Sequence, residues 1–167
     1  MSRRIVVVCT CGASAPLPGD LDAVTDAVLL PSRVLVAVAS RSIAAVDDAV
    51  TLPQFRALVV LDAHDRNVGE LAHELRIQPS TATRLCDRLV RKGLARRTVG
   101  DASRREVAVS LSNSGRSLVR EVTARRRQEI ELIMAKVPAA QRFMIVKALT
   151  AFCEAAGEDP LVHSVPW

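Results

Sequence analysis

Residues 68–94, VGELAHELRIQPSTATRLCDRLVRKGL, are spaced as two short helices joined by a tight turn. Pro79 cannot continue the first helix but suits the first position of the second, where no amide donor is needed. Apolar residues recur on one side of each predicted helix, so the two helices can share one small core. These residues are Leu71, Ala72 and Leu75 in the first helix and Ala82, Leu85, Cys86, Leu89 and Val90 in the second.

The outward face of the second helix carries hydroxyl groups near its amino end and guanidinium groups along its length. Such side chains can contact base edges and phosphates in a DNA major groove. An ordinary amphipathic helix with a solvated charged face would show the same pattern, so the distribution of charge has to separate the two interpretations. The outward residues are Ser80, Thr81, Thr83, Arg84, Asp87, Arg88 and Arg91.

Positive charge is concentrated on this helix pair and on the segment that follows it. Residues 76–105 contain nine Arg or Lys residues and two acidic ones, a net charge of +7, whereas the whole chain of 167 residues carries only +5. The rest of the chain is therefore slightly acidic. A focused cationic patch attracts polyanions, and salt weakens that attraction, so the pattern favours nucleic acid as the partner.

A β-hairpin with a basic tip is predicted after the second helix. Residues 95–99 and 105–111 have the pattern of two strands, linked by a turn around Gly100 and Asp101. The hairpin could follow the phosphate backbone or enter the minor groove while the helix reads the major groove. This arrangement is a winged helix-turn-helix. The clustered basic residues of the hairpin are Arg96, Arg97, Arg104 and Arg105.

Two blocks of the chain resemble the MarR (multiple-antibiotic-resistance regulator) family of bacterial transcription factors. The first is VGELAHELRIQPSTATRLCDRLVRKGLARR and the second is GDASRREVAVSLSNSG, with an Asp, two Arg, an alternating strand and a Gly that opens the next helix. The similarity extends more loosely over about residues 25–156. It implies a mainly α fold with a small β-hairpin wing and long N- and C-terminal dimerisation helices.

Three positions depart from the family pattern. Gln78 stands where a Ser commonly caps the recognition helix, and Gln is a weak cap. Ser103 replaces a frequent acidic residue of the wing, which removes the usual wing-anchoring ion pair unless Asp101 serves instead. Cys86 occupies a core-facing position, where it is expected to act as a small buried apolar residue.

Helices are also predicted on both sides of the DNA-binding region. Asp20 can cap a helix that Pro31 would break or kink, and a second stretch follows from Ser32 to Val46. Ser112 caps a long helix, and Pro138 opens another that Gly157 ends. The expected organisation is a flexible arm (1–19), an N-terminal dimerisation region (20–47), the winged helix-turn-helix (52–111), C-terminal dimerisation helices (112–157) and a tail (158–167).

The terminal helices are more apolar than one wing domain can cover, and the resemblance implies that they interlock into a two-fold dimer; a monomeric helical cap is the alternative. A dimer would place two recognition helices about 34 Å apart on an imperfectly palindromic operator. We expect base-edge contacts from Ser80, Thr81 and Arg84. Phosphate or base contacts are expected from Thr83 and Arg88, backbone contacts from Arg91 and Lys92, and wing contacts from Arg97, Arg104 and Arg105.

The resemblance further implies repression that a small, often aromatic and anionic effector relieves, although the sequence does not identify the effector-binding residues. An alternative is a redox-responsive regulator switched by oxidation of Cys9 and Cys11. An enzyme is not expected, because His64, His73 and His163 stand apart without an obvious nucleophile or metal-ligand spacing. No cofactor and no metal are predicted.

A cytoplasmic location and no membrane partner are expected. The longest uninterrupted apolar run near the first predicted helix, from Val34 to Ala39, is far shorter than the roughly 20 residues that span a bilayer. The basic and apolar start of the chain imitates a secretory signal, but its apolar core is too short. Four cysteines in a helical chain of this size do not suggest a disulfide framework.

Overall fold

The computed structural model describes residues 20–99 and 107–157. The chain divides between Val36 and Ala37 into two compact units. The first unit contains the N-terminal turns of helix α1 (Leu21–Ala44), and the second contains the last turns of α1 and all later elements. The predicted arm, the predicted tail and the tip of the wing lie outside the described residues.

Helix α1 begins where the sequence predicts it, after Asp20, whose carboxylate accepts a hydrogen bond from the amide of Ala23 at 3.2 Å. The helix then continues through Pro31, so of the break or kink predicted there the break does not occur. Proline removes only one amide donor from the helix. Beside it, the Ser32 hydroxyl donates to the carbonyl of Leu29 at 2.6 Å, which adds a local bond.

Among the described residues, α1 is the one helix that is long and apolar enough to cross a bilayer by length and composition alone. The longest uninterrupted apolar run, Val34 to Ala39, did not predict this property. Mean hydropathy over 18 residues can stay high when the window contains two charged side chains. Charged residues such as Asp26 and Arg33 do, however, interrupt an apolar run. Buried core helices and signal sequences can pass the same test, and 11% of this window is buried within the protein.

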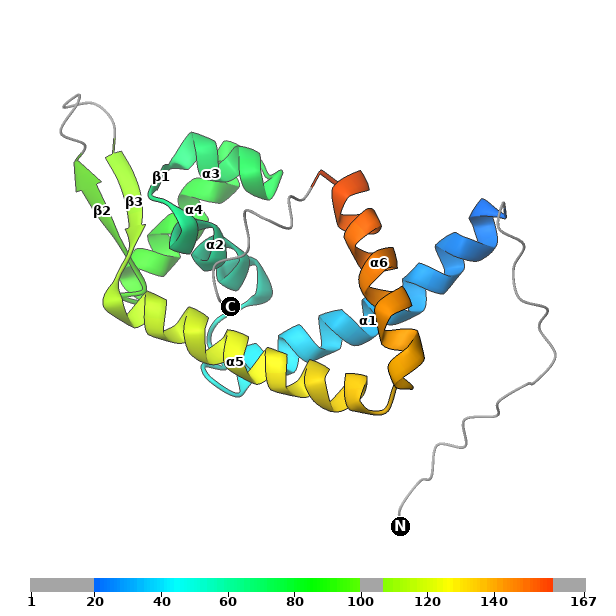
Figure 1. Cartoon of the computed structure of the whole chain (residues 1–167). Coiled ribbons are helices and arrows are strands. Elements are labelled where there is room, and N and C mark those ends of the chain that lie inside the picture. The colour runs from blue at the N-terminus through cyan, green and yellow to red at the C-terminus, as the bar shows by residue number, and fades with distance from the viewer. Residues whose placement is uncertain (1–19, 100–106, 158–167) are drawn as a thin grey trace, which may run out of the picture. The chain divides into compact units, whose positions relative to one another are not determined.

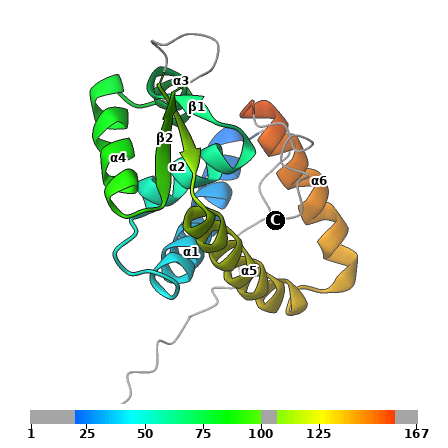
Figure 2. The same ribbon diagram turned by 90° about the vertical axis from the view of Figure 1, so that its left-hand side faces the viewer.

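The winged helix-turn-helix lies in the second unit (Figures 1 and 2). The recognition helix, α4, lies beside β2, and α5 leaves from the end of β3. The elements in chain order are α2 (Leu52–Ala63), β1 (Arg66–Asn67), α3 (Val68–Leu75), α4 (Pro79–Arg91), β2 (Ala95–Val99), β3 (Val107–Leu111), α5 (Asn113–Ala135) and α6 (Ala139–Ala155).

The sheet has three antiparallel strands in the order β1-β3-β2. The predicted hairpin corresponds to β2 and β3, which pair Ala95 with Leu111 and Val99 with Val107. The short strand β1 was not predicted; it pairs Arg66 with Val109 on the other side of β3. This third strand connects the hairpin to the beginning of α3, because α3 starts directly after β1.

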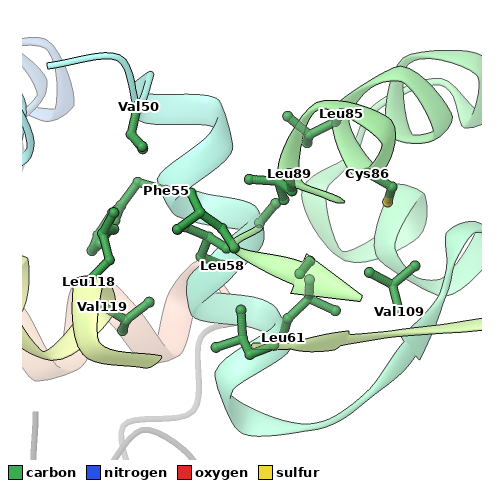
Figure 3. Packing of buried hydrophobic residues seen from close by; sticks show 14 of the residues in the cluster. Val50, Phe55, Leu58, Leu61, Leu85, Cys86, Leu89, Val109, Leu118 and Val119 are labelled. Carbon is green, nitrogen blue, oxygen red and sulfur yellow. The ribbon is translucent and has the colours of Figure 1, made fainter. Parts of the chain in front are cut away.

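One apolar core joins α2, α3, α4, the sheet and the first half of α5. Figure 3 shows Leu58 and Leu61 of α2 facing Leu89 of α4 and Val109 of β3. The predicted stripes of α3 and α4 are buried here, except that Val90 is only partly buried. The α5 residues that enter this core are Leu118, Val119 and Val122.

Helix α6 has no buried residue in the single chain. It starts after Pro138 and is followed by Gly157 at a φ of 77°, as the sequence predicts. Its large apolar side chains are more than half exposed in the single chain, in line with the expectation that one wing domain cannot cover the terminal helices. These side chains are Phe143, Met144, Val146, Leu149 and Phe152.

Candidate nucleic-acid interface

The turn between α3 and α4 is built from local backbone contacts. Arg76 takes a left-handed conformation with a φ of 54°, and its amide donates to the end of α3. The amide of Ile77 also folds back, onto the carbonyl of Ala72 at 2.9 Å. Pro79 is the first residue of α4, and Gln78 makes no side-chain capping bond, as its poor capping ability predicts. The start of α4 is therefore held by the turn and the proline.

The outward face of α4 is exposed along its whole length. Within residues 20–99 and 107–157, none of its three arginines forms an ion pair. The Thr83 hydroxyl donates to the carbonyl of Pro79 at 3.0 Å, which leaves its oxygen lone pairs for an outside donor. The exposed residues with predicted DNA contacts are Ser80, Thr81, Thr83, Arg84, Arg88 and Arg91.

Two arginines of the wing, Arg96 and Arg97, are exposed to solvent and also form hydrogen bonds to other side chains of the protein. Nη2 of Arg97 donates to Oδ1 of Asp87 on α4 at 2.6 Å. Nε of Arg96 donates to Oγ of its cross-strand partner Ser110 at 3.1 Å. The Arg97–Asp87 pair anchors the wing to the recognition helix, a role for which the sequence analysis considered only Asp101. The wing residues Arg104 and Arg105, like Asp101 and Ser103, lie outside the described residues.

Lys92 is exposed, but its ammonium group also forms hydrogen bonds within the protein. Its Nζ donates to the carbonyl of Ala49 and, at 3.2 Å, to Oε1 of the buried Gln54. Lys92 is the C-terminal cap residue of α4, which places its side chain beside the beginning of α2. These bonds were not predicted from the sequence, in which Lys92 directly follows Arg91 on the charged segment.

Cys86 lies on the core side of α4 and is completely buried, as predicted. Burial raises the pKa of its thiol, the nearby Arg97 opposes that rise, and Asp87 adds to it. A buried thiol with a raised pKa is a poor nucleophile. The cysteines of the redox alternative, Cys9 and Cys11, lie outside the described residues.

A hollow of about 490 Å³ opens between α2 and α5, away from the outward face of α4. Phe55, Val59 and Ile130 supply an apolar lining, and Arg126 and Arg127 add two guanidinium groups. Arg127 donates to Glu131 at 2.9 Å, whereas Arg126 forms no ion pair with a described residue. The hollow therefore combines apolar walls with an unpaired positive charge.

Comparison with known proteins agrees with this fold. The family model described as "MarR family" matches residues 50–106. An uncharacterised HTH-type transcriptional regulator of Bacillus subtilis, YsmB, is 35% identical over 81 residues, which are 48% of this chain and 56% of that protein. The match thus spans little more than half of the length of this relative.

Two solved structures extend the similarity over most of the chain. The crystal structure of RV1404 from Mycobacterium tuberculosis is 46% identical, with a TM-score of 0.78 over 86% of this chain and 98% of that one. A mutant of S. aureus MepR bound to an oligodeoxyribonucleotide is 20% identical, with a TM-score of 0.60 over 80% of this chain and 97% of that one. The second likeness concerns the fold alone. Together with its helix-turn-helix and wing, these matches show that the chain belongs to the MarR family of winged-helix transcriptional regulators.

Proposed function

We propose that this protein is a sequence-specific, DNA-binding repressor that acts as a homodimer. The observation that carries the proposal is the exposed face of α4, where hydroxyl groups precede a stripe of arginines that form no ion pair with any described residue. A helix of this kind, held by a wing, fits a major groove with its amino end toward the base edges. The MepR mutant, which shares the fold, was solved with an oligodeoxyribonucleotide, and this supports the same partner here.

Each residue of the interface has a proposed role. Ser80, Thr81 and Arg84, in the first turns of α4, contact base edges, and an arginine there suits the two acceptors of guanine. Thr83 and Arg88 contact phosphates or bases, and Arg91 contacts the backbone. In the wing, Arg97, Arg104 and Arg105 contact the backbone or the adjacent minor groove.

Dimerisation is proposed from the apolar side chains that the single chain leaves in water. Phe143, Leu149 and Phe152 of α6 are each more than half exposed. Several large apolar side chains left in water along one helix indicate an interaction surface. A second copy with two-fold symmetry would cover it and set the two α4 helices about 34 Å apart. The apolar side chains of α1 serve the same interface, and the dimer works in the cytoplasm, where its DNA target lies.

The hollow between α2 and α5 is the proposed effector site. Its volume of about 490 Å³ lies within the range of small-molecule sites. The apolar walls suit an aromatic ring, and the unpaired guanidinium of Arg126 suits a carboxylate. Such an effector releases the operator only if it binds more tightly to the dimer conformation that does not bind DNA.

The test is DNase I footprinting of the full-length protein on DNA flanking its own gene, at 50 and 200 mM salt. We expect two protected half-sites with centres about 10 base pairs apart. If six or more phosphates are contacted, the affinity should fall by roughly a factor of 10³ or more between the two salt concentrations. Light scattering of the same sample should give the mass of a dimer. Uniform protection that does not depend on sequence would contradict sequence-specific repression.

A further inference from the structure

Arg76 is the one residue other than glycine with a positive φ among the described residues. Its φ of 54° and ψ of 46° lie in the left-handed helical region. Glycine adopts this conformation without a steric penalty, whereas an arginine is strained by its Cβ. The helix ending itself requires the conformation, because it lets the amides of Arg76 and Ile77 bond back to the carbonyls of α3. An arginine here thus makes the turn less stable than a glycine would.

The Arg76 side chain gains no compensating bond within the described part of the protein. It is exposed, and it forms no ion pair or hydrogen bond through its guanidinium with residues 20–99 or 107–157. The nearest acidic residue along the chain, Glu74, is already bound by Nε of Arg66 at 2.7 Å. The charge of Arg76 is therefore free for an external anion.

The position of Arg76 identifies that anion. The residue precedes Pro79, the start of α4, by three positions, so the two Cα atoms are at most about 11 Å apart. When a recognition helix enters a major groove about 12 Å wide, the preceding helix crosses the DNA backbone. The turn between them lies at the edge of the groove, within reach of phosphates for a side chain as long as arginine.

We infer that Arg76 binds a backbone phosphate of the DNA at the edge of the major groove, and that the strained turn is retained for this contact. The inference rests on the proposed DNA-binding function and adds a contact outside α4 and the wing. Because a phosphate has the same charge in every sequence, the contact contributes equally to specific and non-specific binding. It also fixes how far the amino end of α4 enters the groove.

Three variants of the full-length protein test the inference. R76G removes the charge and relieves the backbone, R76K keeps the charge, and R125A removes an exposed arginine of α5 as a matched control. Operator and random-sequence duplexes are titrated at several salt concentrations, and the melting temperature of each variant is measured.

We expect R76G to bind both duplexes about tenfold more weakly at low salt. The slope of the logarithm of the binding constant against the logarithm of the salt concentration (the salt slope) should fall in magnitude by about 0.9. Its melting temperature should rise by about 2–4 °C, which excludes unfolding as the cause of weaker binding. R76K and R125A should keep the wild-type slope. Wild-type affinity and slope in R76G would overturn the inference. Absence of salt-dependent DNA binding by the wild-type protein would instead overturn the proposed function, so the two failures are distinct.

Discussion

Nη2 of Arg97 donates to Oδ1 of Asp87 at 2.6 Å, and this ion pair joins the first strand of the wing to the middle of the recognition helix. The two side chains are 45% and 46% exposed, so water screens their attraction. Asp87 is the one acidic residue of α4, and the pair places it among the arginines that are proposed to face DNA. Asp87 therefore influences both the orientation of the wing and the charge of the interface.

D87N should increase binding to random-sequence DNA. The substitution releases Arg97 toward phosphates and removes a negative charge, so the affinity at low salt should rise roughly tenfold and the salt slope by about 1. The free energy of unfolding should change by less than about 1 kcal/mol, because the pair is exposed. D48N removes an exposed acidic residue that lies outside α4 and the wing, and it should leave the slope unchanged. If D87N and D48N had the same affinity for random-sequence DNA and the same salt slope, the Arg97–Asp87 pair would have no role in DNA binding.

R84A should reduce sequence preference more than total affinity. If Arg84 contacts a base edge, operator binding should weaken by about 1–3 kcal/mol, whereas binding to random-sequence DNA should change little beyond the loss of one charge. Competition titrations with both duplexes on the same sample measure the ratio of operator affinity to random-sequence affinity. An unchanged ratio would remove the assignment of Arg84 to base readout.

Gly115 allows α5 to approach the start of β2. A Cβ at this position would lie 2.1 Å from the carbonyl oxygen of Leu94 and 3.1 Å from Cδ2 of Leu111. G115A should therefore lower the free energy of unfolding by about 2–3 kcal/mol, because backbone has to move. G69A is the matched control in α3, where the new Cβ would meet only Oδ1 of Asn67, at 3.2 Å.

Urea unfolding of both glycine variants, at one fixed protein concentration, measures the difference between them. We expect G69A to change stability by no more than about 1 kcal/mol, since alanine also favours a helix. Equal stability of the two variants would contradict the close contact between α5 and Leu94.

The elements that the sequence predicts well are those whose signals are local. The apolar stripes of α3 and α4, Pro79 at the start of α4, and the capping bond from Gly115 to the Ser112 hydroxyl are all formed by residues a few positions apart. Gly157 ends α6 for the same kind of reason. Such features depend little on the rest of the fold.

The features that the sequence did not predict depend on residues distant along the chain or on competing local effects. Strand β1 has only two residues, and it exists because Asn67 lies opposite Ala108 of β3. The ion pair of Arg97 with Asp87 and the hydrogen bonds of Lys92 to Ala49 and Gln54 likewise require the assembled domain. At Pro31, the bonds of the surrounding helix outweigh the loss of one amide donor.

K92M should destabilise the protein without changing its salt slope on DNA. Methionine keeps most of the aliphatic stem but loses the bonds from Nζ to the Ala49 carbonyl and to Gln54, at a cost of about 1–2 kcal/mol. R91M alters the adjacent residue, which is exposed, and should lower the slope by about 0.9 while stability stays nearly constant. Urea unfolding and DNA titration of both variants separate the two roles. A reduced slope in K92M would show that Lys92 contacts DNA after all.

The thiol of Cys86 should react slowly in the native protein. Burial raises its pKa above the ordinary value of 9.0, so the folded state disfavours the thiolate. The stability that this contributes is complete below about pH 9 and is lost as the pH rises through the raised pKa. At pH 8, iodoacetamide followed by mass spectrometry should label Cys86 much more slowly in the folded protein than in the protein unfolded in urea.

C86A removes the titrating group and should flatten the decline of the unfolding free energy above pH 9, whatever its effect at neutral pH. Equal labelling rates of Cys86 in the folded and in the urea-unfolded protein would mean that the core side of α4 opens readily. Cys86 would then be a possible redox-sensitive position on the recognition helix itself.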